Sequence, residues 1–217
     1  MPAADIAWSI DSGRMYFRTG TGLGLLRGVS SLDTSRGSST PTPDGVPNRN
    51  IAHRFHAKLH GTTAVEFWQS VRNVGSDPLD ITKLTMFDGA LELQGAGWRA
   101  MHGELYRQDR YAQNYNYFTG HLLAAIPGVA GTFGTSEDHP FPGILFTHPE
   151  RGTVFMGTLS QNRCKPVWTL SPENGHTKFT AIDWFAGTSR IRVQPGSEIE
   201  TERWIILFVP GNVHDAI

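Results

Sequence analysis

The stretch VEFWQSVRNVGSDPLDITKLTMF, residues 65–87, decides the fold class of this chain. Apolar and polar residues alternate over most of Val65–Val74 and again over Leu79–Phe87. Alternation with a period of two is typical of half-buried β-strands. The residues between the two runs, Gly75-Ser76-Asp77-Pro78, have the composition of a turn. We therefore predict an antiparallel hairpin of the kind that builds a β-sandwich.

Short strands separated by turns also account for most of the remaining chain. We predict two short strands in residues 5–18, further strands in 91–93, 144–146, 153–159, 167–170, 177–185, 189–193 and 198–209, and turns rich in Gly and Pro between them. No segment has a long amphipathic helical period. The 217 residues can bury a sizeable core. The sequence thus predicts an all-β chain, residues 1–217 as one large antiparallel β-sandwich with few or no helices.

Two glycine-rich or polar segments near the N-terminus interrupt this pattern. Gly20, Gly22 and Gly24 lack the spacing of a dinucleotide-binding loop, so we expect a loop or a strand with close backbone approach. Residues 30–50 contain mostly Ser, Thr, Pro, Gly and Asn, and we predict a long exposed loop there.

Composition and charge exclude several classes of function. The formal net charge is −1 and no basic block stands out, which argues against a nucleic-acid partner. No stretch approaches the ~20 apolar residues of a membrane helix, and the N-terminus lacks a signal-peptide pattern. We expect a cytoplasmic protein that needs no cofactor. The single Cys164 excludes an intramolecular disulfide, and a lone Cys is more often structural than nucleophilic.

Two segments carry the residue types of a sugar-binding site. Residues 98–120 hold four of the five Tyr residues, interleaved with Arg, Asn and Gln, and aromatic faces with planar polar groups suit sugar rings. Residues 136–139 place four polar side chains together before a turn. The candidate substrate-binding residues are Trp98, Arg99, Tyr106, Tyr111, Tyr115, Tyr117, Ser136, Asp138 and His139. The alternatives are an aromatic loop that packs on the sandwich or on another domain, and a solvated loop whose carboxylates cap turns.

Catalytic and metal sites have weaker signals in this sequence. Glu137, Asp138 and His139 are the weak catalytic candidates, but neighbouring residues of an extended segment point to opposite faces, which is poor geometry for a carboxylate pair. Asp88, Glu92, His121 and Asp183 remain as other acid or base candidates. His56 and His60 share one face of a strand or of a helix, whereas His53 lies with His56 only on a helix. We therefore predict no metal site here, and expect a solvated strand that carries polar His side chains.

The residues of two segments carry a resemblance to a known family. Glu66–Leu93 resembles the two-strand core of the N-terminal β-supersandwich domain of family 36 glycoside hydrolases, the α-galactosidase group. Residues 193–217, VQPGSEIETERWIILFVPGNVHDAI, resemble the closing strands of that domain, with a Glu202-Arg203 pair and a Gly-Asn turn before a linker helix. The strand, turn and strand of residues 146–160 are also similar. This fold is also called galactose-mutarotase-like.

The resemblance implies a non-catalytic role. The catalytic aspartates of that family lie on a barrel, and residues 211–217 resemble the start of the linker that leads to it. The implied partners are a carbohydrate, the catalytic barrel, on which such a domain packs, and a possible homo-oligomer; its loops can reach the rim of the sugar pocket. The alternative is a stand-alone mutarotase-like enzyme or carbohydrate-binding protein that uses the 98–118 aromatic segment and the 136–139 polar segment.

Overall fold

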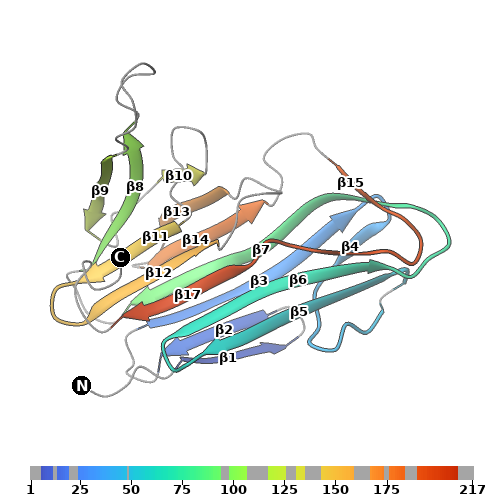
Figure 1. The fold of residues 1–217 in the computed structure, drawn as a ribbon, viewed down its shortest axis with the longest axis horizontal. Coiled ribbons are helices and arrows are strands. Elements are labelled where there is room, and N and C mark those ends of the chain that lie inside the picture. Colours follow the sequence, from blue (N-terminus) through green and yellow to red (C-terminus); the bar gives the residue numbers. More distant parts are fainter. Residues whose placement is uncertain are drawn as a thin grey trace.

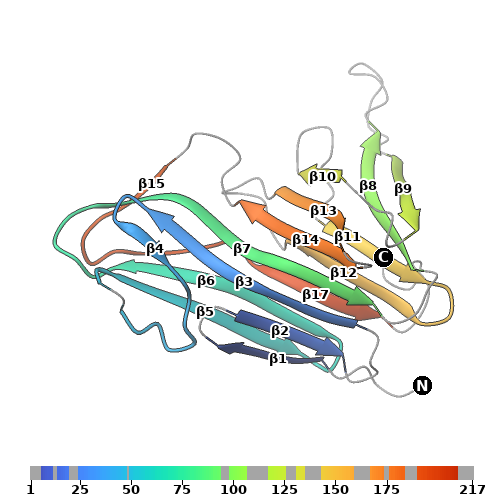
Figure 2. The same ribbon diagram turned by 180° about the vertical axis from the view of Figure 1, so that it is seen from behind.

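The computed structural model describes residues 6–11, 14–19, 24–47, 49–93, 98–106, 117–125, 131–134, 143–158, 167–173, 176–183 and 190–209. These residues form strands and connecting turns, and they include no helix. The strands build two antiparallel sheets stacked as a sandwich (Figures 1 and 2). This architecture confirms the predicted all-β fold class.

The first sheet has nine strands among the described residues. Its order is β1 (Ile6–Asp11), β2 (Arg14–Thr19), β3 (Gly24–Thr34), β7 (Leu79–Leu93), β14 (His176–Asp183), β13 (Val167–Glu173) and β10 (Gly131–Gly134), with β4 (Gly37–Ser39) paired to β3 and β15 (Ile191–Val193) paired to β7.

The second sheet has eight strands in the same part of the chain. Its order is β16 (Glu198–Glu200), β6 (Ala64–Asn73), β17 (Trp204–Val209), β12 (Gly152–Thr158), β11 (Gly143–His148), β8 (Arg99–Tyr106) and β9 (Tyr117–Ala125), with β5 (Ile51–His60) paired to β6.

The long run from β6 to β7 forms two strands, as predicted, but not a hairpin. β6 lies in the eight-stranded sheet and β7 in the nine-stranded sheet, so the turn at residues 74–78 carries the chain from one layer to the other. Buried Asn73 fixes this crossing, because its Nδ2 donates to the carbonyl oxygens of Asp77 at 2.7 Å and Val193 at 3.0 Å. Its Oδ1 accepts from the Gly75 amide at 3.0 Å. A hairpin and such an arch share the same alternation, because each strand has one face in the core.

The prediction of one exposed loop over residues 30–50 is wrong for its first part. β3 continues to Thr34 and β4 follows, while Leu32 is fully buried between the layers. Leu32 lies in a strongly polar segment, so its sequence signal is a single apolar residue. Residues 40–47 do run outside named strands, apart from a parallel bridge between Thr42 and Arg54. The hairpins β1–β2 and β11–β12 match their predictions.

A chain of buried polar groups links the two layers. His53 Nε2 lies 2.6 Å from Gln69 Oε1. Gln69 Nε2 donates to Ser30 Oγ and points toward the Met86 carbonyl, and Ser30 Oγ donates to the Thr85 carbonyl at 2.9 Å. Burying these groups would be costly without partners, so the chain also fixes how the sheets stack.

Gly28 allows a buried aromatic ring to lie directly on strand β3. A Cβ added at Gly28 would stand 2.6 Å from Phe87 Cζ and 2.7 Å from the Asp88 carbonyl oxygen. Phe87 itself is 0% exposed. Gly28, which follows the Gly20–Gly24 run, therefore makes a close backbone approach, while Gly20 and Gly22 lie outside the described residues.

Candidate functional site

The predicted aromatic segment begins and ends in the β8–β9 hairpin rather than in a loop. Tyr106 and Tyr117 are opposite one another in the register and close the described part of this hairpin. Residues 107–116, which include Tyr111 and Tyr115, lie outside the described residues. Figures 1 and 2 show the hairpin projecting from one end of the sandwich. The strands thus place the two ends of the aromatic segment beside each other and away from the core.

The predicted polar segment falls between β10 and β11 in the sequence. Ser136, Glu137, Asp138 and His139 lie outside the described residues, between β10 of one sheet and β11 of the other. Ile144 at the start of β11 is opposite His102 of β8. Tyr106 is four positions after His102 along β8, which corresponds to about 13 Å in an extended strand. The described start of β11 therefore lies beside β8 of this hairpin, and contact between the polar segment and the hairpin stays a prediction.

Trp98 and Arg99 stand at the base of the hairpin. The Trp98 side chain is 1% exposed, and its ring centroid lies 5.4 Å from that of His148 at an interplanar angle of 57°. In the described structure this ring packs inside the protein, so sugar stacking on Trp98 stays a prediction. Arg99 is exposed and is opposite Thr147 and Ala125 in the register.

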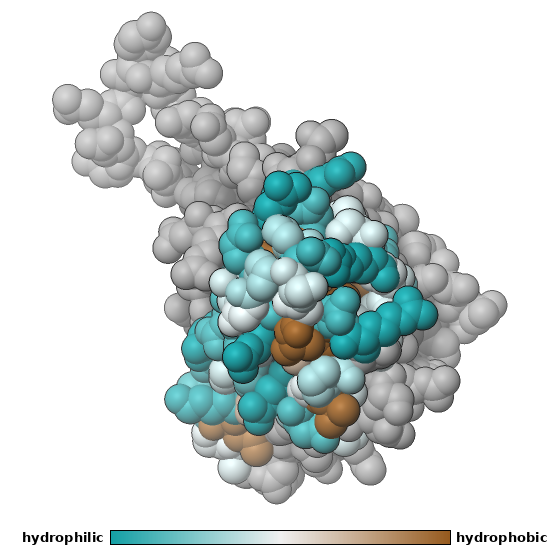
Figure 3. Space-filling model, turned by 90° about the vertical axis from the view of Figure 1, so that its right-hand side faces the viewer, coloured by the Kyte–Doolittle hydropathy of each residue, from teal (hydrophilic) through white to brown (hydrophobic). Residues whose placement is uncertain are grey.

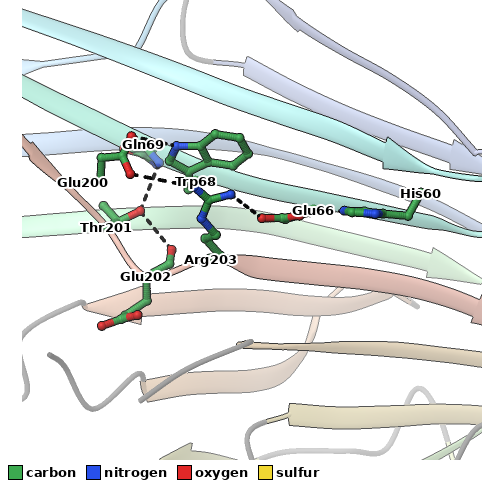
Figure 4. Close-up of polar contacts among 8 residues, drawn as sticks. All are labelled: His60, Glu66, Trp68, Gln69, Glu200, Thr201, Glu202 and Arg203. Atoms are coloured by element: carbon green, nitrogen blue, oxygen red, sulfur yellow. Dashed lines mark hydrogen bonds and ion pairs between the residues drawn. The ribbon is translucent and has the colours of Figure 1, made fainter. Parts of the chain in front are cut away.

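The densest described polar cluster lies elsewhere, on the outer face of the eight-stranded sheet (Figure 4). Glu66 is buried at its centre. Arg203 Nη1 donates to Glu66 Oε1 at 2.7 Å, and His60 Nε2 lies 2.6 Å from Glu66 Oε2. We call these residues, with Trp68 and Glu200, the Glu66 cluster. Arg203 belongs to the Glu202-Arg203 motif of the resemblance, and in the structure its guanidinium bonds Glu66 of β6.

Trp68 packs between residues from both neighbouring strands. His56 of β5 stacks on it, with ring centroids 4.9 Å apart and an interplanar angle of 5°. The Arg203 guanidinium carbon lies 4.2 Å from the ring centroid. Trp68 Nε1 points toward Glu200 Oε1 at 3.4 Å. Because protein groups already pack on the indole, Trp68 is poorly suited to stack on a sugar.

The electrostatics of the Glu66 cluster indicate a structural role. The hydrogen bond from Arg203 is the main cause that lowers the pKa of Glu66, with His60 adding to it, so the carboxylate is held ionised. Burial lowers the pKa of His56, with nearby Arg54 contributing. A carboxylate whose two oxygens are already bonded is a poor general acid or base. The cluster therefore clamps β5, β6 and the approach to β17.

The three histidines of β5 do not converge. His53 is 1% exposed and faces the core, which corrects the expectation that these side chains are all solvated. His56 lies 2.9 Å from Ser70 Oγ, and His60 belongs to the Glu66 cluster. Within the described residues, no three His, Cys, Asp or Glu side chains are grouped so that they could hold a metal ion.

The other acid and base candidates are spread over both sheets. His121 is opposite His102 in β8–β9, whereas Asp183 is opposite Thr85 and Asp88 opposite Thr180 in the other sheet. Glu92 is opposite Leu25. Cys164 lies outside the described residues. Asp88, Glu92 and Asp183 thus belong to the nine-stranded sheet and His121 to the eight-stranded sheet.

The described surface shows no broad apolar patch at the end that carries β15 and the β6–β7 turn. Hydrophilic residues cover most of that end, and hydrophobic ones form separate spots (Figure 3). Val46, Val74 and Leu59 are the exposed large apolar residues of the described part. No helix in the same residues could cross a membrane.

Comparison with known proteins supports the fold. No protein-family model and no curated protein matches the sequence. Among solved structures, the α-galactosidase from Lactobacillus brevis matches 98% of this chain with a TM-score of 0.54 and 9% identity. Two family 36 α-galactosidases of Geobacillus stearothermophilus, AgaB and the A355E variant of AgaA in complex with 1-deoxygalactonojirimycin, match 98% and 97% of it, each with a TM-score of 0.50 and 9% identity.

These matches cover only part of each solved enzyme. The chain spans 27% of the Lactobacillus brevis structure and 26% of each Geobacillus structure. At 9% identity the likeness concerns the fold and not the side chains of a site. Over nearly its whole length, this chain has the fold of a β-sandwich portion of family 36 α-galactosidases.

Proposed function

We propose that this chain is a non-catalytic, carbohydrate-associated domain of a glycoside hydrolase that resembles α-galactosidases. In this role the sandwich packs on a catalytic barrel. The β8–β9 hairpin and the 136–139 segment extend toward the rim of a sugar pocket or toward a contact between subunits.

The observation that carries this proposal is the extent of the structural match. Nearly the whole chain aligns with about a quarter of each α-galactosidase. A chain that corresponds to one part of a longer enzyme is expected to support the part that performs the chemistry. The fold alone does not determine function, so the proposal also needs support from the residues.

The described charged residues agree with a supporting role. Glu66 is buried, and both of its carboxylate oxygens are bonded, one by Arg203 and the other by His60. Asp80 is bonded by Arg192 at 2.8 and 3.1 Å. Such pairs hold neighbouring strands together, and neither of these two carboxylates is placed to act as a general acid.

An activity assay together with a sugar titration tests the proposal. The purified chain should not hydrolyse an aryl α-galactoside at an enzyme-like rate, and polarimetry on fresh α-galactose should show no faster mutarotation than buffer. A galactose titration followed by NMR should give weak shifts confined to the β8–β9 hairpin, which Tyr106→Ala and Tyr117→Ala should abolish. Enzyme-like turnover of either substrate would show that the chain is an enzyme by itself.

A further inference from the structure

Among the described residues, the C-terminal half of β5 has a backbone partner on one side only. β5 pairs with β6 along residues 51–60, and within the described residues its other side carries only the short bridge to Thr42. Leu59 is 48% exposed and its neighbours Lys58 and His60 are also exposed. Thr42 pairs at the buried half of the strand, whereas residues 58–60 are exposed and have no described strand on that side.

The orientation of the backbone groups on this edge follows from the Thr42 contact. The Thr42 amide donates to the His53 carbonyl at 3.0 Å, and the Phe55 amide donates to the Thr42 carbonyl at 3.0 Å. Odd-numbered residues of β5 therefore direct their amides and carbonyls away from β6. By strand alternation, Ala57 and Leu59 point their backbone groups the same way. These groups make no other backbone pairing within the described part of the chain.

The outer face of this edge carries a row of basic side chains. Alternate positions of β5 hold Arg54, His56, Lys58 and His60, a set that we call the basic row. Arg54 Nε donates to the Pro43 carbonyl and His60 contacts Glu66. Lys58 makes no ion pair or side-chain hydrogen bond within the described residues. A lysine on an open edge discourages pairing with a like-charged strand.

This row disfavours a second copy of the chain as the occupant. When two copies of one edge pair antiparallel about a twofold axis, residues of the outer face oppose residues of the outer face. Registers that bring Lys58 opposite Lys58 or opposite Arg54 would place two cations against one another. Like charges directly opposite are destabilising in a sheet.

We propose that the β5 edge binds an extended acidic peptide segment of a partner protein as an additional strand. Backbone hydrogen bonds to Ala57 and Leu59 supply the pairing, as in other cases of β-strand addition. Acidic residues of the segment lie beside the basic row, and the alternate apolar residues lie beside Ala57 and Leu59. The proposal does not depend on the glycosidase role, because it uses only the geometry and charge of this edge.

Fluorescence anisotropy with a labelled heptapeptide, in which glutamate alternates with valine, tests the proposal on the 217-residue chain. The peptide should bind, and binding should weaken about tenfold when salt rises from about 50 to about 300 mM. Lys58→Glu should weaken it by at least about tenfold, because a like charge then opposes the peptide. Arg151→Glu, an exposed charge change in the β11–β12 turn, should leave binding unchanged.

Ala57→Pro separates strand addition from simple anion binding. It removes the outward amide but no hydrogen bond to β6, and proline is tolerated at such an edge position. Binding should be lost while the thermal unfolding midpoint stays close to that of the unmodified chain. A peptide methylated on the backbone nitrogens that face β5 should also fail to bind.

Four results would overturn the proposal. The first is no binding of the alternating peptide. The second is equal binding to the Ala57→Pro chain, which would show an anion site without strand pairing. The third is displacement of the peptide by polygalacturonate at lower concentration than by unlabelled peptide, which would assign the row to an acidic polysaccharide. The fourth is sedimentation that shows self-association lost in Lys58→Glu, which would assign the edge to a second copy.

Discussion

Arg203 Nη1 lies 2.7 Å from Glu66 Oε1, although 137 positions separate the two residues in the chain. The Glu66 side chain is 7% exposed and that of Arg203 is 45% exposed. The pair joins β6 to the segment that leads into β17. β6 and β17 are neighbouring strands of the eight-stranded sheet. A largely buried carboxylate thus depends on a cation that solvent can still reach.

Replacement of Arg203 by methionine should lower the free energy of unfolding by about 1–2 kcal/mol. The full cost of breaking a buried pair, about 3–5 kcal/mol, is not expected because Arg203 is partly solvated and His60 still contacts Glu66. Urea unfolding at neutral pH measures the change. Arg72→Met, on the same sheet face, is the control and should cost less than about 0.5 kcal/mol. Adding Glu66→Met to the Arg203→Met chain should recover stability, and a further loss would contradict this account.

Asn73 gives a second prediction, at the crossing between the sheets. Asn73→Ala leaves the Asp77 and Val193 carbonyls and the Gly75 amide without their side-chain partner. The free energy of unfolding should fall by about 2–3 kcal/mol, because Asn73 is buried and all three backbone groups lose their hydrogen-bond partner at once. Thermal unfolding compared with Ser76→Ala, an exposed change in the same turn, measures it. Equal midpoints for the two variants would show that the turn does not depend on Asn73.

The fold class could be predicted from sequence, but the pairing of β6 with β7 could not. Alternation reports that a strand has one buried face, which holds both in a hairpin and in an arch between layers. The information that selects the arch lies in Asn73 and Val193, 120 positions apart. Likewise, Arg203 has an adjacent glutamate in sequence, while its actual partner is on a distant strand.

The candidate site was predictable only in its location along the chain. The structure places β8 between β9 and β11, a neighbourhood that the sequence alone did not indicate. It does not test which side chains there meet a sugar. The strand around Leu32 was missed for another reason. A single apolar residue within a Ser- and Thr-rich segment does not produce the alternation that indicates a strand.

Gly28→Ala should destabilise the nine-stranded sheet. The added Cβ would meet both the Phe87 ring and the Asp88 carbonyl oxygen, and the second contact involves backbone that cannot rotate away. Overpacking of this kind costs about 1–3 kcal/mol. Gly61→Ala is the comparison, because nothing lies within 4 Å of its added Cβ and only its positive φ of 63° is unfavourable. If Phe87→Leu fully restores the Gly28→Ala chain, the backbone contact is not the cause.

His53 should make stability fall in mildly acidic solution. Burial lowers its pKa from 6.5 to about 4, while Gln69 and the Ser39 backbone favour protonation and only partly oppose this. Nε2 faces Gln69 Oε1 and so carries the proton of the neutral ring. Nδ1 makes no hydrogen bond of ordinary geometry in the neutral form, and protonation would let it donate to the Ser39 backbone.

The direction of the pH effect follows from proton binding. Between pH 6.5 and about 4 the unfolded chain binds a proton at His53 that the folded chain does not, so the free energy of unfolding falls as pH falls through this window. Through His53 the free energy of unfolding should fall by roughly 3 kcal/mol in total, and the fall is complete once the pH is below the pKa of the folded state. The His53→Gln chain has no titrating group at this position but keeps every other titratable group of the unmodified chain. The difference in free energy of unfolding between the two chains, from urea titrations at several pH values, should therefore shift in favour of His53→Gln on acidification. A difference that stays constant with pH would show that His53 is solvated when the chain is folded.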